Sequence, residues 1–597
     1  MRQIVRLLIV TDDQSETAHG GFLRWVDQDP ADAGGDFSRD FHLGEFVRCL
    51  SDTSWVGFDL RIVKAHRSPA GHEGFTEAQI KADRGADVIG FRFDQPFTID
   101  RREFTLSDFD VVMFFSLAFN DPDPALAPEA EAIARFMEDG GGFFGTGDHF
   151  FLGAPLLGLV PRVRSMRRWW SVTGPNGEPA APPPFGSTRI DTTRAGADGV
   201  TNFEDQSDDV PQEIKPKLYP SGYFFGRIRM LPHPLLCSPD GRITVLPDHM
   251  HEGLCEVPDN LAARTFTLDG AEVREYPDYT PADAPAGYVP QPLAPEVVAT
   301  GTVLEGVTSP ELDPAHHGDD IPAEGQEFGV IGAWDGHRVG RGRVVVDSTW
   351  HHFFDINLSG DRHLEDNDLP DGQRQMLFGF FVPGADGTRE LNDAGRMIMA
   401  YFRNLIYWLI PAGRRALTFW PALDKVVRRP QLREELATLA GFDRLTLPHY
   451  LHFGQLAEKY FSQARGACAT YELLIRLPPD LEFPVRDWLR DNFDPWDPKW
   501  KFRGFEKLRR EQWLGGLGLA PGMNIIPQLT LGIGVVAAAV TLAKRKRDDD
   551  EGRVGKLLST AFADAQRHAL GELHKLLAAG ADVQSKFARM TQRPPPR

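Results

Sequence analysis

Strand-length apolar runs alternate with helix-patterned segments over the first 150 residues, and this alternation limits the fold more than any other feature of the chain. Residues 4–10 form the first run, and apolar residues recur at helical spacing over 41–50. A second helical pattern, at 128–137, ends at a glycine cluster. Further short apolar runs lie at 59–63, 86–91, 109–115 and 143–147. Continuous apolar strands separated by helices predict an α/β fold, in which helices cover both faces of a parallel sheet.

The composition then shifts and the sheet pattern returns. From 162 to about 325, proline, glycine, aspartate and aromatic residues dominate, which predicts long surface insertions. Two more strands, at 328–334 and 342–347, are joined by a polar, glycine-containing connection of the hairpin type. We therefore predict that the first domain spans 1–360.

The last third of the chain is predicted to be mostly helical. A connecting segment with a long amphipathic helix occupies 361–420, and helical periodicity continues over 421–597. No charged residue occurs in 512–543, but its densest apolar part, 529–543, is shorter than the roughly 20 residues that span a bilayer. We expect a buried hairpin or a core helix here. The alternative is a membrane contact through 529–547, which ends in the basic sequence KRKR.

The charge and the cysteine content limit which partners the protein is expected to bind and in which cellular compartment it is expected to lie. Lys and Arg number 65 against 85 Asp and Glu, a net charge of -20, so the whole-chain field repels nucleic acid. The basic, aromatic segment 162–170 is expected to pair with the protein's own carboxylates. The four cysteines, which are far apart and form no C-x-x-C pair, favour a reducing compartment: Cys49, Cys237, Cys255 and Cys468. Aspartates directly after the first run argue against a signal peptide, so we expect a cytoplasmic protein.

Polar residues follow several of the predicted strands. In an open parallel sheet, ligands bind outside the carboxyl ends of the strands. The loop after the first strand carries Asp13 and His19, and the strand near 143–147 contributes Gly145 and Gly147. We predict these four residues to be substrate-binding positions, with a small polar molecule as the ligand.

Asp148 and His149 occupy a tight turn between a short strand and an apolar helical run. Glycines on the approach to such a turn allow it to present a side chain at the top of the sheet, beside helix amides. Neither residue is a serine or a cysteine, so a side-chain nucleophile of that kind is missing. We predict catalytic roles for both; the alternative is that Asp148 caps the following helix while His149 packs nearby.

His351 and His352 follow the last predicted strand. If that strand is adjacent to the one before Asp148, an imidazole here faces Asp148 across the crevice and serves as a general base or a ligand. The alternative is aromatic packing against Trp350 and Phe353.

The sequence DHMHE at 248–252 is the group most similar to a metal-binding site. His249 and His251 lie two residues apart, which places both imidazoles on one face of an extended segment, and Glu252 adds a carboxylate. These three residues are predicted to bind one divalent metal ion, zinc, manganese or iron. The alternative is a polar network that closes a loop over the sheet edge.

Three stretches resemble a known family: FDVVMFFSLAF, PEAEAIARFMEDGGGFFGTGDHFF and GRGRVVVDSTWHHFF. They are similar to the class I glutamine amidotransferase-like superfamily, in particular its ThuA-like branch, over about residues 1–360. The resemblance implies a flavodoxin-like sheet. In the amidotransferases of that superfamily a cysteine in the turn pairs with a histidine after the last strand. Here the turn falls at 147–149 without a cysteine, and the histidine position falls at His351 or His352, so glutamine hydrolysis is not expected.

Two functional hypotheses follow. The first is an enzyme with this fold that hydrolyses a small polar substrate by histidine and aspartate acid–base chemistry, with or without a metal. The second is a non-catalytic ligand-binding or scaffold protein, whose helical C-terminal half binds a partner or a membrane surface. The sequence leaves the oligomeric state open.

Overall fold

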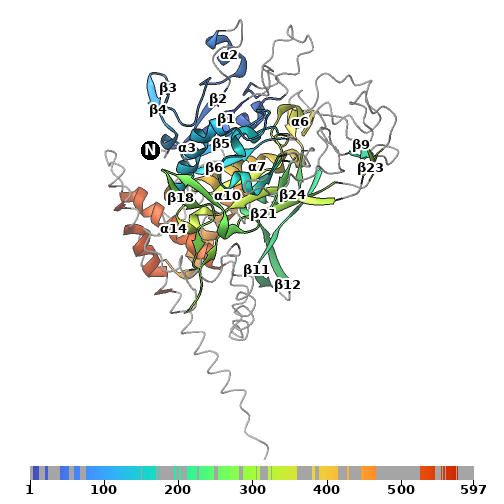
Figure 1. Ribbon diagram of the computed structural model, residues 1–597. Coiled ribbons are helices and arrows are strands. Elements are labelled where there is room, and N and C mark those ends of the chain that lie inside the picture. Colours follow the sequence, from blue (N-terminus) through green and yellow to red (C-terminus); the bar gives the residue numbers. More distant parts are fainter. Residues whose placement is uncertain are drawn as a thin grey trace, which may run out of the picture.

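A nine-stranded sheet forms the centre of the computed structural model (Figure 1). The structure describes residues 4–12, 20–23, 41–52, 59–67, 76–148, 151–169, 172–173, 194–195, 201–202, 212–224, 227–247, 253–281, 287–303, 306–308, 321–323, 326–359, 379–383, 389–414, 427–428, 445–465, 496, 525–544 and parts of 553–575. Across the sheet the strands follow the order β15-β10-β21-β24-β25-β6-β5-β1-β2.

Five strands make the parallel half of this sheet. They are β1 (Ile4–Thr11), β2 (Asp59–His66), β5 (Val111–Phe115), β6 (Gly142–Thr146) and β25 (Val344–Asp347). In space they run β2-β1-β5-β6-β25, and every neighbouring pair is parallel. Numbered along the chain, this is the order 2-1-3-4-5 of the flavodoxin-like fold. The predicted fold class is confirmed.

The other four strands extend the sheet in antiparallel fashion. They are β10 (Gln212–Pro216), β15 (Val245–Leu246), β21 (Glu296–Val303) and β24 (Gln326–Trp334). Strand β24 pairs with β25, β21 with β24, and β10 with both β21 and β15. Part of the region that composition marked as an insertion therefore belongs to the central sheet. Proline and glycine content marks turns, but it does not reveal which short segments between the turns pair into a sheet.

Helices cover both faces of the parallel half, as predicted. In β1, Leu7 and Ile9 enter one apolar cluster with α1 (Gly44–Ser51) and α7 (Asp393–Leu409). The alternating residues Leu8 and Val10 enter a second cluster with α3 (Ala127–Glu138). Successive strand residues point to opposite faces, so one strand contributes to two cores. Helix α7, the long helix predicted within 361–420, thus packs directly against the sheet.

One predicted strand is wrong. Residues 86–91 form a single bridge, between Val88 and Ala65, beside β2 at the sheet edge. Gly85 and Gly90 have positive φ angles of 61° and 62° and bend the chain on either side of the bridge. The apolar run serves packing instead, since Phe91 is buried against Phe93.

Smaller elements complete the described chain. The helical ones are α2 (Glu77–Arg84), α4 (Ala154–Leu157), α5 (Val163–Met166), α6 (Asp355–Ser359), α10 (Leu447–Arg465), α14 (Ile525–Lys544) and the 3-10 turns η5 (Leu106–Asp108), η6 (Pro124–Leu126), η8 (Pro234–Leu236), η9 (Leu261–Ala263) and η10 (Gly336–Val339). The strands form two-stranded ribbons: β3 (Phe97–Ile99) with β4 (Arg102–Phe104), β7 (Arg167–Arg168) with β16 (Leu254–Cys255), β8 (Arg194–Ala195) with β9 (Thr201–Asn202), β11 (Leu218–Phe224) with β12 (Arg227–Pro232), β13 (Cys237–Ser238) with β14 (Gly241–Arg242), β17 (Thr265–Leu268) with β18 (Ala271–Arg274), β19 (Asp278–Tyr279) with β20 (Gln291–Pro292), β22 (Gly306–Thr308) with β23 (Ile321–Ala323), and β26 (Phe381–Pro383) with β27 (Arg389–Leu391).

A separate apolar core lies in the C-terminal region. Helices α10 and α14 pack closely together, and helical residues between 553 and 575 join them through Phe562 and its neighbours. The apolar run at 529–543 lies in α14 and is mostly buried in this core, so the core-helix alternative is the one found. Among the described helices, none combines the length and apolar character that a membrane crossing requires.

The cysteines differ in state. Cys49 and Cys255 are free and buried, whereas Cys237 is disulfide-bonded. Disulfides are uncommon in reducing compartments, so the expectation of a reducing compartment does not account for Cys237.

Candidate functional site at the carboxyl edge of the sheet

The register of the parallel strands brings their polar ends to one edge. Asp347 of β25 pairs with Thr146 of β6, which pairs with Phe115 of β5, which pairs with Thr11 of β1. The residues that follow these four strands therefore lie along the same edge. They include Asp12, Ser116, Asp148 and the segment from Ser348 to His352. Three of the predicted polar groups begin here, as expected for a flavodoxin-like sheet.

Asp148 and His351 meet across this edge. The Nε2 atom of His351 lies 3.3 Å from Oδ2 of Asp148. The Thr349 hydroxyl donates to Oδ1 of the same carboxylate at 3.0 Å. On the other side of the imidazole, Nδ1 lies 2.9 Å from Oδ1 of Asn357 in α6. The predicted opposition of the turn after β6 and a histidine after β25 is thus present.

These contacts fix the orientation of the His351 imidazole ring. When the Nδ1–H of His351 donates to Asn357 Oδ1, the second ring nitrogen, Nε2, is directed toward the Asp148 carboxylate. The histidine and the aspartate therefore form a close polar contact at the carboxyl edge.

Arg167 holds the two loops that carry this pair. Its Nη2 donates to the carbonyl oxygens of Asp148 and Ser348, at 3.0 and 2.7 Å, and its Nε donates to that of Asp347 at 3.0 Å. The guanidinium lies over the ring of Trp169, 4.4 Å from its centroid. A fully buried positive charge thus stabilises a site that contains several carboxylates.

His352 belongs to a second, adjacent chain of hydrogen bonds. Its Nδ1 lies 2.7 Å from Oδ1 of Asp347, and the Tyr401 hydroxyl donates to Oδ2 of that aspartate at 2.6 Å. Burial and the Asp347 carboxylate raise the pKa of Tyr401 well above its ordinary value, so the phenol stays a donor. Among the described residues, Nε2 of His352 is buried without a hydrogen-bond partner. His352 therefore contacts Asp347, whereas His351 is the one that faces Asp148.

Asp12 joins β1 to β5 where the strand order reverses. Its carboxylate accepts from the Ser116 hydroxyl at 2.7 Å and from the backbone N–H groups of Leu117 and Ala118. Burial raises the pKa of the Asp12 carboxyl, although Arg67 and these donors oppose the shift. Asp12 therefore connects the end of β1 to the segment after β5, at the place where the strand order reverses. Ligands bind at this place in flavodoxin-like folds.

The two glycines predicted to bind substrate are closely packed. Gly145 lies within β6, and an added Cβ would contact the side chains of Leu157 and Val163. At Gly147 an added Cβ would come within 2.2 Å of the Leu152 carbonyl oxygen. Gly147 therefore leaves no room for a side chain and allows two backbone segments to approach closely, whereas a side chain at Gly145 would require its side-chain neighbours to shift by a few tenths of an ångström.

Six predicted site residues lie outside the described residues: Asp13, His19, His149, His249, His251 and Glu252. Their described neighbours do reach the carboxyl edge. A Cβ on Gly20 would lie 2.1 Å from the Asp12 carbonyl oxygen, and one on Gly253 would lie 2.5 Å from that of Ser348. Within the described parts of the chain, no three His, Cys, Asp or Glu side chains lie close enough together to bind one metal ion.

Sequence reasoning missed the residues that support the pair. Thr349 and Asn357 are close in sequence to His351, so its neighbourhood was the available signal. In the basic segment 162–170, Arg162, Arg164 and Arg168 form ion pairs with carboxylates as expected. Arg167 instead donates to backbone carbonyl groups. For Tyr401, which reaches Asp347 from the middle of α7, the sequence offers no signal.

The site is closed. Asp148 is 3% exposed and His351 1% exposed, and Thr349 and Asn357 are fully buried. Comparison of the chain with protein-family models, curated proteins and solved structures found no match.

Proposed function

We propose that the carboxyl edge is the acid–base site of a hydrolase that acts on a small polar substrate. The contact between Asp148 and His351, with the imidazole fixed by Asn357, is the observation that supports this proposal. The placement of the pair, after β6 and after β25, is also the arrangement expected from the resemblance to the amidotransferase-like superfamily. That superfamily assignment is part of the proposal.

The proposed chemistry moves one proton. As a water oxygen attacks the substrate, the pair takes up the water proton at Nε2 of His351 or Oδ2 of Asp148. It then returns a proton to the leaving group. Asn357 keeps the ring orientation constant, and Thr349 holds the carboxylate. No side-chain nucleophile is needed, because water attacks directly.

A panel of small activated esters and amides tests the proposal. We expect His351→Gln and Asp148→Asn each to lower kcat/KM for the hydrolysed members by about 10²- to 10⁴-fold. His452→Gln, a substitution at an exposed position on α10, is the matched control and should change nothing. Unchanged hydrolysis in both site variants would contradict the assignment. Failure of the wild-type protein to hydrolyse any member would contradict the hydrolase proposal.

The proposed divalent metal has its own test. His249, His251 and Glu252 have the donor chemistry for zinc, manganese or iron, and the described residue that follows them, Gly253, lies beside the loop after β25. If they bind a metal, elemental analysis of purified protein should find about one ion per chain, and the double variant His249→Ala with His251→Ala should lose it. An unchanged metal content in the double variant would exclude these ligands.

The burial of the pair favours a second candidate. Buried polar groups joined by hydrogen bonds also occur as rigid structural networks. A non-catalytic ligand-binding or scaffold protein, with a helical C-terminal half that binds a partner, agrees with the closed site. This candidate predicts that His351→Gln lowers stability without affecting any turnover.

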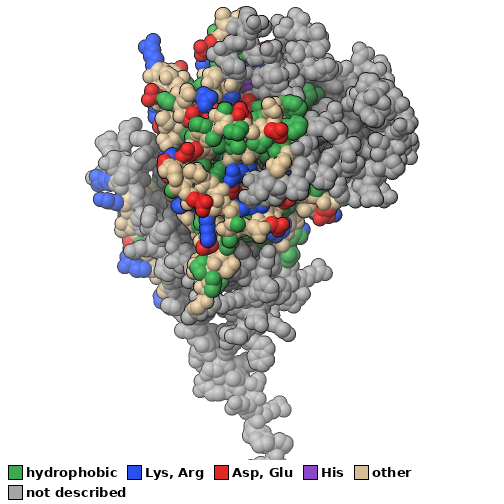
Figure 2. Space-filling model, viewed as in Figure 1, with side chains coloured by type: hydrophobic (Ala, Val, Ile, Leu, Met, Phe, Trp, Pro, Cys, Tyr) green, Lys and Arg blue, Asp and Glu red, His purple; other side chains and the backbone are tan. Residues whose placement is uncertain are grey.

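A small-molecule ligand agrees better with the charge distribution than nucleic acid does. The described part of the face in Figure 2 shows acidic and basic side chains interspersed, and the chain carries a net charge of -20. A cytoplasmic location, with or without membrane association through 529–547, belongs to the proposal as well. Cell fractionation tests it directly.

A further inference from the structure

Cys237 is bound covalently to another cysteine, and the cysteine content of the chain identifies the partner. The chain has four cysteines. Cys49 and Cys255 are free, whereas Cys237 is disulfide-bonded. The fourth, Cys468, lies outside the described residues. A disulfide within one chain needs a second cysteine, and only Cys468 remains for Cys237.

The two free thiols are held in other parts of the sheet domain. Sγ of Cys49, in α1, lies 3.7 Å from the carbonyl oxygen of Met399, and Sγ of Cys255, in β16, donates to that of Val330 at 3.2 Å. Burial raises the pKa of both thiols, that of Cys49 to about 11. Only a thiolate attacks a disulfide, so neither group exchanges readily with the bond at Cys237.

Cys237 lies in a segment that α7 holds against the sheet. This anchor segment, 232–237, contains the end of β12, the turn η8 and the start of β13. Asn404 of α7 donates from Nδ2 to the carbonyl oxygens of Leu235 and Cys237, at 3.1 and 2.6 Å. The side chains of Leu235 and Cys237 are fully buried. A covalent bond to Cys237 is therefore a bond to a fixed point of the sheet domain.

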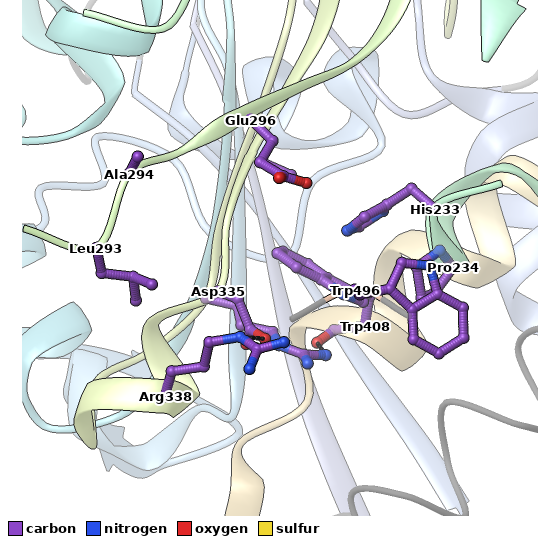
Figure 3. A pocket seen from close by; sticks show the side chains of 11 residues that line it. His233, Pro234, Leu293, Ala294, Glu296, Asp335, Arg338, Trp408 and Trp496 are labelled. Carbon is purple, nitrogen blue, oxygen red and sulfur yellow. Dashed lines mark hydrogen bonds and ion pairs between the residues drawn. The ribbon is translucent and has the colours of Figure 1, made fainter. Parts of the chain in front are cut away.

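The C-terminal region reaches the same anchor segment through Trp496. The indole N–H of Trp496 donates to the carbonyl oxygen of Pro232 at 3.0 Å. Figure 3 shows Trp496 beside Pro234 and Trp408, and these three residues line one pocket. Trp496 is only 6% exposed. A second, independent contact thus brings a residue that follows α10 in the sequence onto the anchor segment.

The helical core of α10 and α14 is otherwise separate from the sheet. The two helices pack against each other, and their apolar cluster contains no strand of the central sheet. Within the described part of the chain, no strand of that sheet shares an extended contact with either helix. Cys468 follows Arg465, the last residue of α10, three positions later in the sequence. A bond at Cys468 therefore acts directly next to this core.

From these observations we propose that Cys237 and Cys468 form a redox-dependent disulfide that joins the C-terminal helical core to the sheet domain. The bond forms when the two thiols pass two protons and two electrons to an oxidant such as oxidised glutathione, which becomes two glutathione thiols. A dithiol reductant reverses the step: it returns two protons and two electrons to the cysteines and is itself oxidised to a cyclic disulfide. Reducing compartments keep thiols reduced, so the link closes only where an oxidant is present.

Mass spectrometry of the full-length protein tests the pairing. The protein is equilibrated with oxidised glutathione, unfolded in urea without reductant and alkylated with iodoacetamide. We expect alkylation of Cys49 and Cys255 alone, and a digest in which the Cys237 peptide is joined to the Cys468 peptide. Non-reducing electrophoresis should show a monomer. Alkylation of all four cysteines, or Cys237 joined to anything but Cys468 of the same chain, would overturn the proposal.

Hydroxyl-radical footprinting tests whether the link holds the core in place. In Cys468→Ser we expect the labelling of Trp496 to rise several-fold, because its ring is then held at the anchor segment by non-covalent contacts alone. Cys49→Ala is the matched control, since it removes a free thiol and keeps the bond, so Trp496 should stay as protected as in the wild type. Trp334, fully buried in β24, is the internal standard.

Reduction of the wild type gives the same comparison without a substitution. Protein reduced with dithiothreitol and then desalted should match Cys468→Ser in the labelling of Trp496. Circular dichroism should show that the reduced protein and both variants are folded. Equal labelling of Trp496 in the oxidised and the reduced wild type would contradict the role of the disulfide in holding the helical core.

Discussion

The Asp347 carboxylate is the hydrogen-bond acceptor for two buried side chains behind the carboxyl edge, those of His352 and Tyr401. One of its carboxylate oxygens contacts Nδ1 of His352 and the other accepts from the Tyr401 hydroxyl, and all three residues are fully buried. A buried carboxylate that loses one of its donors retains the cost of its removal from water. Residues outside the proposed acid–base pair should therefore contribute strongly to stability.

Removal of the Tyr401 hydroxyl should expose this dependence. We expect Tyr401→Phe to lower the free energy of unfolding by about 1–3 kcal/mol, because Oδ2 of Asp347 then loses its short hydrogen bond. Urea denaturation measures the change. Tyr450→Phe is the control: its hydroxyl makes a longer contact, 3.4 Å to His568, so its loss should cost less. An equal effect of both substitutions would contradict the special role of Asp347.

Cys49 should make stability depend on alkaline pH. Burial raises the pKa of the Cys49 thiol to about 11, from an ordinary value of 9.0. Between these two values the unfolded chain loses the thiol proton while the folded chain keeps it. Stability is then fully present below pH 9 and falls as the pH rises toward 11, by up to about 3 kcal/mol. Urea denaturation at pH 8.5 and 10.5 should show a larger loss in the wild type than in Cys49→Ala; equal losses would exclude the effect.

The sequence located Asp148 and His351, which contact each other, but not the groups that hold them. Asp148 and His351 were predictable because each directly follows a strand-like run, and parallel strands end at one edge. Whether His351 or His352 faces Asp148 depends on one turn of backbone after β25, which residue type does not specify. Arg167 and Tyr401 act from remote segments, so contacts formed by packing decide their roles.

At the scale of elements, α10 and α14 pack through a glycine. Gly532 of α14 lies against the backbone of α10, where an added Cβ would come within 1.8 Å of the Tyr450 carbonyl oxygen. Backbone atoms cannot move aside as a flexible side chain does. The close approach of the two helices therefore requires glycine at this position.

Substitution of that glycine should force the helices apart. We expect Gly532→Ala to destabilise the C-terminal core by about 1–3 kcal/mol, as overpacking does. Gly571 is also in a helical segment, and a Cβ there would meet nothing within 4 Å, so Gly571→Ala should stabilise by up to about 1 kcal/mol. Thermal unfolding followed by circular dichroism compares the two. A neutral Gly532→Ala would show that the helices separate without cost.

Most strands of the sheet were predictable from the spacing and length of apolar runs in the sequence. The strands that the sequence did not predict correctly have physical explanations. The parallel strands are continuous apolar runs, which sequence reveals directly. The antiparallel extension is built partly from short or half-exposed strands such as β10 and β15, which give weak signals. The false strand at 86–91 is apolar because it is buried at the edge of the sheet, not because it pairs along its length.

At the scale of the whole molecule, the described apolar residues form clusters on the two faces of the sheet and a third one around α10 and α14. The third cluster contains no strand of the central sheet. Figure 1 shows α14 at the side of the molecule, away from β1 and β5. Local stability should therefore differ between the sheet and the helical core.

Hydrogen exchange should resolve this difference. In Gly532→Ala, we expect the amides of α10 and α14 to exchange faster, while those of β1 and β5 keep their wild-type protection. Mass spectrometry of peptides from the two regions measures both in one experiment. Equal acceleration in the sheet and in the helices would show that they unfold as one cooperative unit.

The position of β25 in the chain has a consequence for biosynthesis. Strand β25 has only four residues, Val344–Asp347. In the sheet it lies between the parallel strands formed by the first 146 residues and the antiparallel strands formed by residues between 212 and 334. Until the ribosome has released this segment, β6 lacks its neighbour on that side, and its unpaired edge is exposed to other nascent chains. His351 emerges directly after β25, so no truncated translation product that ends before it can contain the Asp148–His351 pair.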